Sequence, residues 1–471
     1  MTKEQKVKEK LPKGVMVAAI IMVLGALPPM FDSTIVNVAV NSLAKTFNTD
    51  LFVMQWAVTG YVLALGITVP LSGWLMRRVA GKTIFMGSLG LFMLGSLLAG
   101  LSWNVESLIA FRVFQGFASG ILIPTLTTLV VQLGGKNNTG KIMSLVSIPS
   151  VFGPIIGPVI GGLILQYLHW SWLFYINLPL GVIGLIFLQW KLPKFEAVDK
   201  SAKLDWLGVL LLAVTSGAFI YGVTQITKEV SRSTGAIFLS VGAVAFLAYV
   251  FYALLRKGKA VISLDMFRSK NFSASFISLF LAGFATNGPM LLFPMLFQNV
   301  IGLSVVESAL WLIPQGVGML ITRSQIGKLT DRIGARYVVI PSVLVIIIGT
   351  VPFVFFGAAT SQWLIWAVLL VRGMGIGGFT IPVMSDSYTG LDKPQIPTAS
   401  VATRIIQNIG SAFGSAVLAT VVSTVFAKQA NNLVGAYHAG FITSLIFMVV
   451  GIVPALFLTN KLNKKQGGSD I

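Results

Sequence analysis

Two charged residues lie inside apolar stretches where a charge is costly, and they are the first candidates for chemistry. Asp32 interrupts the apolar run from Gly14 to about Ser42, and Arg112 lies within a second apolar run. Both runs reach the roughly 20 residues that a bilayer-crossing helix needs. An ionisable side chain at that depth costs about 2.5 to 3.5 kcal/mol on insertion scales, so it normally faces protein or water and marks the path of an ion or a substrate.

The guanidinium of Arg112 is permanently charged and needs a partner. Asp32 is the only acid well inside a span of the first half, so we expect the two side chains to share an aqueous pocket as a proton-coupling pair. Arg112 favours the ionised carboxylate and burial favours the protonated one, and the balance sets when the proton leaves. Two structural alternatives stay open: a static pair that holds two spans together, and an Asp32 that caps a helix break after Pro28-Pro29.

Composition places the chain in a membrane. Hydrophobic residues make up 55% and charged residues 10% of its 471 residues, whereas soluble proteins average about 25% charged residues. The absence of cysteine excludes disulfides and thiol catalysis, and His169 and His438 lie too far apart in sequence to suggest a metal pair, so we expect no cofactor. The basic segment from Lys3 to Lys13 precedes an apolar run without a small-residue cleavage site, which indicates a retained first span.

Windows of about 20 apolar residues predict fourteen spans, centred near residues 28, 65, 92, 120, 154, 181, 215, 245, 284, 315, 345, 374, 410 and 449. An even number places both termini on one side. If that side is cytoplasmic, the outer loops hold only four basic residues, Lys45, Lys228, Arg232 and Lys428, as the positive-inside rule requires. The formal net charge of +19 then faces anionic lipids, and no nucleic acid is expected.

An internal repeat divides the chain. The segment GWLMRRV at 73–79 returns in altered form as GKLTDRIG at 327–334, and GILIP at 120–124 returns as GFTIP at 378–382. Parallel repeats of this kind build many secondary transporters, with the substrate site near the midplane between the halves. Because the spacing corresponds to eight spans, we expect two six-span halves, 1–195 and 261–471, separated by two extra spans in 196–260.

These motifs resemble one family over essentially the whole chain. The segment DSTIVNVA at 32–39, the second-span residues Gln55, Trp56, Tyr61, Pro70 and Gly73, and WSWLFYINLPLG at 170–181 are similar to signatures of the fourteen-span drug:proton antiporters of the major facilitator superfamily. The resemblance implies an all-α membrane fold of two six-helix bundles plus two extra helices. It also implies proton-driven export of drugs across the cell membrane, antibiotic resistance, and a part for Arg112 in proton transfer.

The loop after the second span departs from the family pattern, which has an Asp where this chain has Arg77 and a Gly where it has Ala80. The family's conformational latch depends on that Asp, so the second-half copy is expected to carry the gating. The gating candidates are Gly73, Arg77, Arg78, Asp331 and Arg332, with Arg372 and Arg404 as two further arginines at membrane depth. For these last two, hydrogen bonding between helices is the alternative, and Asp386 could reach one of them.

The fifth span places Gly153, Gly157 and Gly161 one above another on one helix face. Small residues in such a row allow close helix contact, and Pro154 and Pro158 remove backbone donors and bend the helix. These five residues are further gating candidates. In the resembled superfamily this Gly-Pro pattern accompanies antiporters, which implies export. Generic small-residue packing is the alternative.

A set of aromatic and flexible apolar side chains could line a central cavity. They are Trp56, Tyr61, Met290, Phe293, Phe297 and Trp311, with Asn287 and Gln298 as polar groups. Such a surface suits varied lipophilic ligands, although contact with lipid or with neighbouring helices is the alternative for any one of them. Glu307 completes a capping box with Ser304, which predicts a helix start there.

We therefore expect a monomeric, proton-coupled antiporter that exports small lipophilic substrates, with protons and membrane lipids as its other partners. The nearest alternative is a proton-coupled transporter of a specific metabolite or lipid precursor. An enzyme is not expected, because no nucleophile, base and orienting group can be assembled from these residues. The Gly-rich segment near residue 375 also lacks the Lys-Ser or Lys-Thr pair of a phosphate-binding loop.

Overall fold

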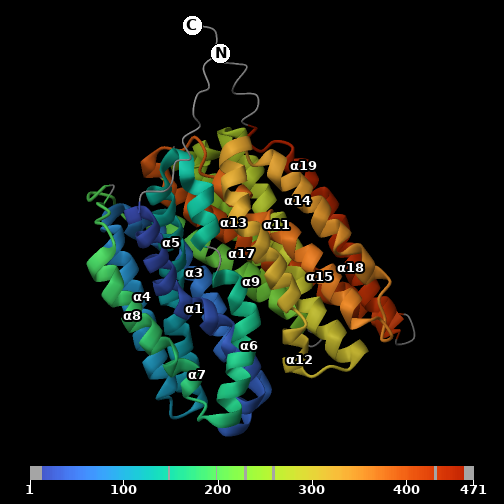
Figure 1. The fold of residues 1–471 in the computed structure, drawn as a ribbon. Helices are drawn as coiled ribbons and strands as arrows, with labels where there is room; N and C mark the ends of the chain where they lie inside the picture. Colours follow the sequence, from blue (N-terminus) through green and yellow to red (C-terminus); the bar gives the residue numbers. More distant parts are fainter. Residues whose placement is uncertain are drawn as a thin grey trace.

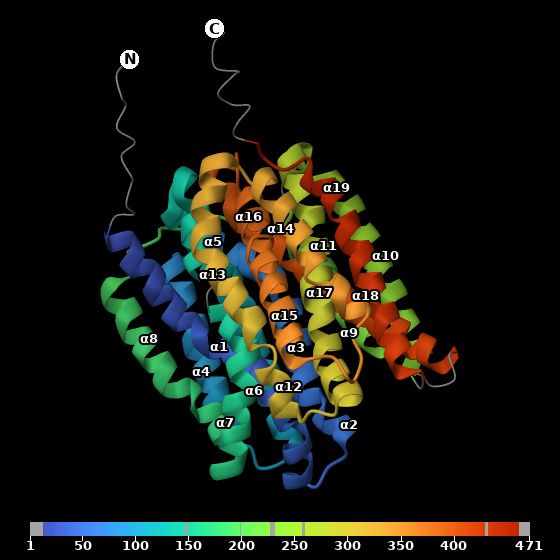
Figure 2. The same cartoon turned by 45° about the vertical axis from the view of Figure 1, so that its right-hand side comes forward.

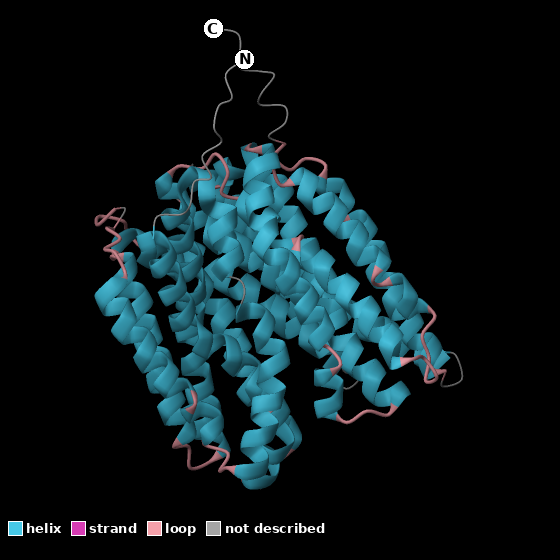
Figure 3. Cartoon of the chain, viewed as in Figure 1, coloured by secondary structure: helices cyan, strands magenta, loops and turns pink. Residues whose placement is uncertain are grey.

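The computed structural model describes residues 13–146, 149–197, 199–226, 231–256, 260–428 and 432–460. Within these ranges every regular element is helical, and Figure 3 draws no strand in them. Long apolar runs require this outcome in lipid, because a helix satisfies its backbone hydrogen bonds internally. The expected all-helical class is confirmed.

The first part of the chain forms α1 (Lys13–Thr46), α2 (Leu51–Met54), α3 (Trp56–Arg78), α4 (Gly81–Gly100), α5 (Val105–Val146), α6 (Pro149–Tyr167), α7 (Trp172–Tyr175) and α8 (Asn177–Lys191). Two helices follow, α9 (Trp206–Ile226) and α10 (Arg232–Arg256). The remainder forms η2 (Leu264–Arg268), α11 (Lys270–Leu296), η3 (Phe297–Ile301), α12 (Val305–Leu310), α13 (Ile313–Ile333), α14 (Arg336–Ile348), η4 (Val351–Val354), α15 (Gln362–Gly377), α16 (Thr380–Asp386), η5 (Lys393–Gln395), α17 (Ile396–Lys428), α18 (Leu433–Val450) and α19 (Ile452–Ala455).

The helices stand in two groups side by side. Helices α1 to α8 pack mainly with one another, as do α11 to α19, and Figure 1 shows the two groups to the left and right. Helix α1 begins and α19 ends at the same end of the molecule, as Figures 1 and 2 agree. We call this the terminal end.

The number of spans in the structure agrees only in part with the number predicted from the sequence. Among the described residues, 12 helical segments are long and apolar enough to cross a membrane. The two other expected spans, near residues 154 and 315, coincide with helices α6 and α13, which are not among those 12. Fourteen spans therefore stays a prediction.

Of the two extra helices, α9 packs on both groups and α10 packs mainly on α9. Ile220 of α9 lies against Gly66 of α3, and Ile67 of α3 lies against Gly217 of α9. Side chains of each helix thus fill the space beside glycines of the other. On α17, the ring of Phe413 lies 5.7 Å from that of Phe219. Helix α9 thus packs on both α3 and α17 where these two helices meet.

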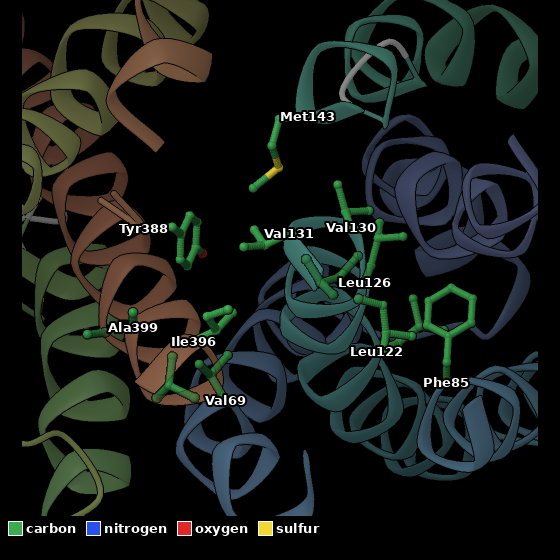
Figure 4. Packing of buried hydrophobic residues seen from close by; sticks show 14 of the residues in the cluster. Val69, Phe85, Leu122, Leu126, Val130, Val131, Met143, Tyr388, Ile396 and Ala399 are labelled. Carbon is green, nitrogen blue, oxygen red and sulfur yellow. The ribbon is translucent and has the colours of Figure 1, made fainter. Parts of the chain in front are cut away.

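Apolar side chains join the two groups toward the terminal end. Figure 4 shows Val69, Val131 and Met143 of the first group facing Tyr388 and Ile396 of the second, all in one buried cluster. Because these large side chains fill the space between the groups, the halves are packed against each other at this end.

Candidate functional site

Asp32 and Arg112 form an ion pair in the interior of the first group. Asp32 lies on α1 and Arg112 on α5, and Arg112 Nη1 donates to Asp32 Oδ2. Their side chains are 0% and 1% exposed, so lipid and bulk solvent are both excluded in this conformation. Helix α1 continues through Pro28 and Pro29, so the alternative in which Asp32 caps a helix break is wrong.

Three neutral side chains close the ion pair into a ring of hydrogen bonds. Arg112 Nη1 also donates to Gln115 Oε1 at 2.9 Å, and Gln115 Nε2 donates to Ser96 Oγ at 2.7 Å. Asn177 Nδ2 donates to the same Ser96 Oγ at 3.3 Å and to Asp32 Oδ1 at 3.0 Å. The ring joins α1, α4, α5 and α8, because each of these helices contributes at least one member.

The guanidinium is also held from α3. Arg112 Nε donates to the carbonyl of Ala57 at 3.1 Å, and the Arg112 Cζ atom lies 4.3 Å from the centre of the Tyr61 ring. The Tyr61 hydroxyl donates to Ser119 Oγ at 3.0 Å. A buried charge with this many partners has a fixed position, and removing one partner of a buried pair costs about 3 to 5 kcal/mol because the other is left uncompensated.

The glycine face of α6 brings α1 close to that helix beside Asp32. A side-chain carbon on Gly157 would lie 2.1 Å from Thr34 Oγ1, and one on Gly153 would lie 2.9 Å from the carbonyl of Met30. Thr34 Oγ1 donates to the carbonyl of Gly153 at 2.9 Å. Gly161 packs in the same row on Ile35. The close helix contact expected from these glycines is confirmed. The side chains of Pro154 and Pro158 are not among those that the structure describes.

The second group contains a buried arginine whose hydrogen bonds all go to neutral acceptors. Arg372 donates to Gln315 Oε1 at 2.6 Å, to Thr350 Oγ1 at 3.2 Å and to the carbonyl of Ala285 at 3.1 Å. Its Cζ lies 4.9 Å from the centre of the Phe293 ring. No acid pairs with it among the described residues, so this position, unlike that of Arg112, carries a fixed positive charge.

Of the gating candidates in the first half, Gly73 packs on Val401 of α17. Arg77 pairs at 3.4 Å with Asp199, which lies in the segment between α8 and α9. Hydrogen bonds from Ser201 hold the pKa of Asp199 below its usual value, and the charge of Arg77 lowers it further. Arg78 donates to the carbonyl of Ala202 at 3.5 Å. The loop after α3, which has Arg77 where the family pattern has an Asp, thus contacts the segment between α8 and α9.

The second-half copy of the loop contacts the first group directly. Asp331 at the end of α13 accepts hydrogen bonds from the backbone of Gly140 at 3.1 Å and Lys141 at 3.0 Å, both on α5. Arg332 is exposed. Arg404 donates to Gln407 at 3.2 Å on its own helix. Asp331 therefore joins the halves at the terminal end.

Asp386, the acid near the end of α16, joins other elements of the second group. Asp386 accepts hydrogen bonds from Thr459 and, at 3.4 Å, from Ser275. It therefore fastens the segment after α19 to α11. In the described part of the chain, no group of three or more His, Asp or Glu could hold a metal ion.

The substrate-binding candidates do not gather in one place. Tyr61 lies against Arg112 of the ring, whereas Phe293 lies against Arg372 in the second group. Beside Arg372, Met290 Sδ accepts a hydrogen bond from Gln315 Nε2 at 3.2 Å. Phe297 is fully buried and contacts Trp311 at 5.4 Å.

The remaining candidates are Trp56, Gln298 and Asn287. Trp56 stacks on Tyr221 of α9 at 5.7 Å. Gln298 is half-buried in η3. The side chain of Asn287 lies outside the described residues.

Sequence reasoning did not single out three members of the ring: Ser96, Gln115 and Asn177. Gln115 had a usable signal, because it follows Arg112 by three residues and therefore shares its helix face. Asn177 was the one amide in the apolar segment at 170–181. Ser96 had no signal beyond being a small polar residue in an apolar helix.

Known proteins resemble this chain in sequence and in fold. Residues 22–415 match the family described as Major Facilitator Superfamily. The chain is 28% identical to a multidrug resistance protein B homolog of Mycobacterium tuberculosis over 89% of its length and 78% of that protein's length. It is 26% identical to the lincomycin resistance protein LmrB of Listeria monocytogenes over 91% of its length and 93% of that protein's length.

Solved structures with the same fold are more distant in sequence. The human organic anion transporter MFSD10 superposes with a TM-score of 0.65 at 15% identity, covering 94% of this chain and 100% of that chain. The proton:xylose symporter XylE superposes with a TM-score of 0.65 at 16% identity, covering 94% of both chains.

Proposed function

The chain belongs to the Major Facilitator Superfamily and is a multi-span membrane transporter rather than an enzyme, and from this premise we propose that it exports lipophilic drugs in exchange for protons. The names of its relatives, a multidrug resistance protein and a lincomycin resistance protein, support drug efflux. We propose that it lies in the cytoplasmic membrane with its terminal end inside the cell, since its basic residues gather in the loops of that side.

The buried pair of Asp32 and Arg112 is the observation that carries proton coupling. A carboxylate at membrane depth is expensive and marks an ion path, and Asp32 can bind or release a proton. Arg112 keeps its charge and stabilises the ionised state, while burial disfavours that state once the pair separates. A conformational change that moves Arg112 relative to Asp32 therefore changes the proton affinity.

Exchange requires conformations other than this one. Asp32 is closed to solvent here, and the halves are packed together at the terminal end through Asp331 and the apolar cluster around Val131 and Tyr388. In alternating access the two halves rock about a site between them. Opening this end must break the hydrogen bonds of Asp331 to Gly140 and Lys141, and we assign Asp331 the role of the latch.

Transport by purified protein in liposomes tests the proposal. An inward-directed proton gradient should drive lipophilic dye movement in the wild type, and collapsing the gradient should stop it. Asp32→Asn should lose the response to the gradient while keeping any dye exchange that runs down the dye's own gradient. Dye movement that ignores the proton gradient in the wild type would contradict antiport.

A matched control uses the exposed pair of Asp265 and Arg268, whose side chains are 52% and 86% exposed. Asp265→Asn makes the same chemical change outside the membrane interior. It should transport like the wild type, so a loss shared with Asp32→Asn would show that the assay reports general damage.

A proton-coupled transporter of a metabolite or lipid precursor is the second candidate function, and Arg372 favours it. A fixed cation with Gln315 and Thr350 beside it suits a polar substrate better than a purely apolar dye. The same liposomes separate the two, because transport of a polar solute with no dye movement would favour the second.

A further inference from the structure

One buried polar atom of the ring lacks a partner. Asn177 is 0% exposed, and within the described structure its Oδ1 accepts no hydrogen bond, although its Nδ2 donates two. Buried side-chain oxygens are normally satisfied, and an exception needs an explanation. Here the orphan belongs to the residue that contacts Asp32 directly, so the explanation concerns the proton site.

The two oxygens of Asp32 have different neighbours. Oδ2 accepts from the charged Arg112, and Oδ1 accepts from the neutral amide of Asn177 at 3.0 Å. A proton on Oδ2 would face the guanidinium, so the favourable place for it is Oδ1. The proton on Oδ1 then meets the N–H of Asn177, and two donors cannot hydrogen-bond to each other.

We propose that Asn177 is a positioning residue that matches both protonation states of Asp32 by turning its side-chain amide over. This inference rests on the proposed proton coupling. An amide has a donor and an acceptor of nearly equal shape, so a rotation of about 180° places Oδ1 where Nδ2 was. A carboxylate needs the donor there, and a carboxylic acid needs the acceptor.

Hydrogen bonds balance in both states. With Asp32 ionised, Asn177 Nδ2 donates to Asp32 Oδ1 and to Ser96 Oγ. When a hydronium ion transfers its proton to Asp32 Oδ1 and leaves as water, the turned amide accepts from that new O–H and from the Ser96 hydroxyl, whose hydrogen can rotate. Asn177 Oδ1 lacks a partner before the turn, and Nδ2 takes its place and lacks one after the turn. Turning the amide therefore does not add an unsatisfied group.

The groups around Asp32 leave this task to Asn177. The charged and titratable side chains that face it are Arg112 from α5 and Tyr61 from α3. Arg112 only donates, and Tyr61 donates to Ser119. Helix α4 offers the neutral Ser96, and α6 meets α1 through glycines. Asn177 therefore keeps α8 joined to α1 before and after protonation.

Infrared difference spectroscopy of the full-length protein in lipid tests this directly. Spectra at acidic and alkaline pH should show the carboxylic acid band of Asp32 appear on acidification, and this band should be missing in Asp32→Asn. At the same pH the side-chain carbonyl band of Asn177 should move to lower frequency, because its oxygen gains hydrogen-bond donors. Carbon-13 labelling of asparagine and its loss in Asn177→Leu, or in Asn177→Ala if that folds better, identify the band.

The outcomes separate the two proposals. A carboxylic acid band without any movement of the Asn177 band overturns the amide turnover and leaves proton binding at Asp32 intact. The absence of a titrating Asp32 band overturns the proposed function and this inference with it. Ser119→Ala is the matched control: it removes a buried hydroxyl next to Tyr61 but outside the ring, and both bands should respond in it as in the wild type.

Discussion

Gly157→Ala should destabilise the protein through a single contact beside Asp32. The added methyl group would lie 2.1 Å from Thr34 Oγ1 and 2.9 Å from Thr34 Cβ, well inside van der Waals contact. Overpacking of this kind costs about 1 to 3 kcal/mol. Alanine recovers about 0.5 to 1 kcal/mol relative to glycine within a helix, so we expect a net loss of about 0.5 to 2 kcal/mol.

Reversible unfolding in mixed detergent and SDS measures this loss. Gly90→Ala in α4 is the matched control, because a methyl group there meets nothing within 4 Å and should leave stability unchanged or slightly raised. In a Thr34→Ala background, which removes the clashing oxygen, Gly157→Ala should cost at least about 1 kcal/mol less, as expected for residues in contact. The reasoning fails if Gly157→Ala behaves like Gly90→Ala, or if its cost is unchanged in the Thr34→Ala background.

Three further predictions follow from buried and exposed charges. Arg112→Met should cost about 3 to 5 kcal/mol because it leaves Asp32 buried without its counter-charge, whereas Arg372→Met leaves no acid behind and should cost less, both measured by unfolding in mixed detergent and SDS. Asp331→Ala should open the terminal end, seen as faster maleimide labelling of a cysteine introduced into the cysteine-free chain on the α5 side of that contact. Because the pKa of Asp199 is lowered in the folded protein, its contribution to holding the segment before α9 should be present above about pH 4 and lost as the pH falls through the lowered pKa, measured by proteolysis of that segment.

The Asp331→Ala variant has a control of the same chemical type. Asp392→Ala removes an exposed carboxylate and should leave the labelling rate unchanged. If Arg372→Met destabilises the protein as much as Arg112→Met does, the loss of the counter-charge of Asp32 is not the reason for the cost of Arg112→Met. Proteolysis of the Asp199 segment that does not change with pH would contradict its hydrogen-bond account.

The sequence predicted those features that depend on one segment or on the high cost of a buried charge. The pairing of Asp32 with Arg112 followed from burial, since a charge at depth needs a partner. The capping box of Ser304 and Glu307 is present, because it depends on only four consecutive residues. The contact of the α6 glycines with a neighbouring helix followed from their spacing alone.

Features that depend on how helices are rotated against each other were not predictable from one sequence. The ring needs Ser96 and Asn177 to face Arg112 from two other helices, and helical periodicity does not fix that rotation. Arg77 finds its partner Asp199 in a distant segment that carries no pattern of its own. Phe293 and Phe297 have a composition suited either to a ligand cavity or to a packed core, and the structure places both in a core cluster.

Proton release on substrate binding is the most direct test of the coupling by Asp32. Purified protein in weakly buffered detergent solution is mixed with a lipophilic dye that it transports, and the pH of the solution is followed. The wild type and Asp265→Asn should release protons when the dye binds, and Asp32→Asn should release none. Equal release from Asp32→Asn and the wild type would show that another group carries the proton and would contradict the account.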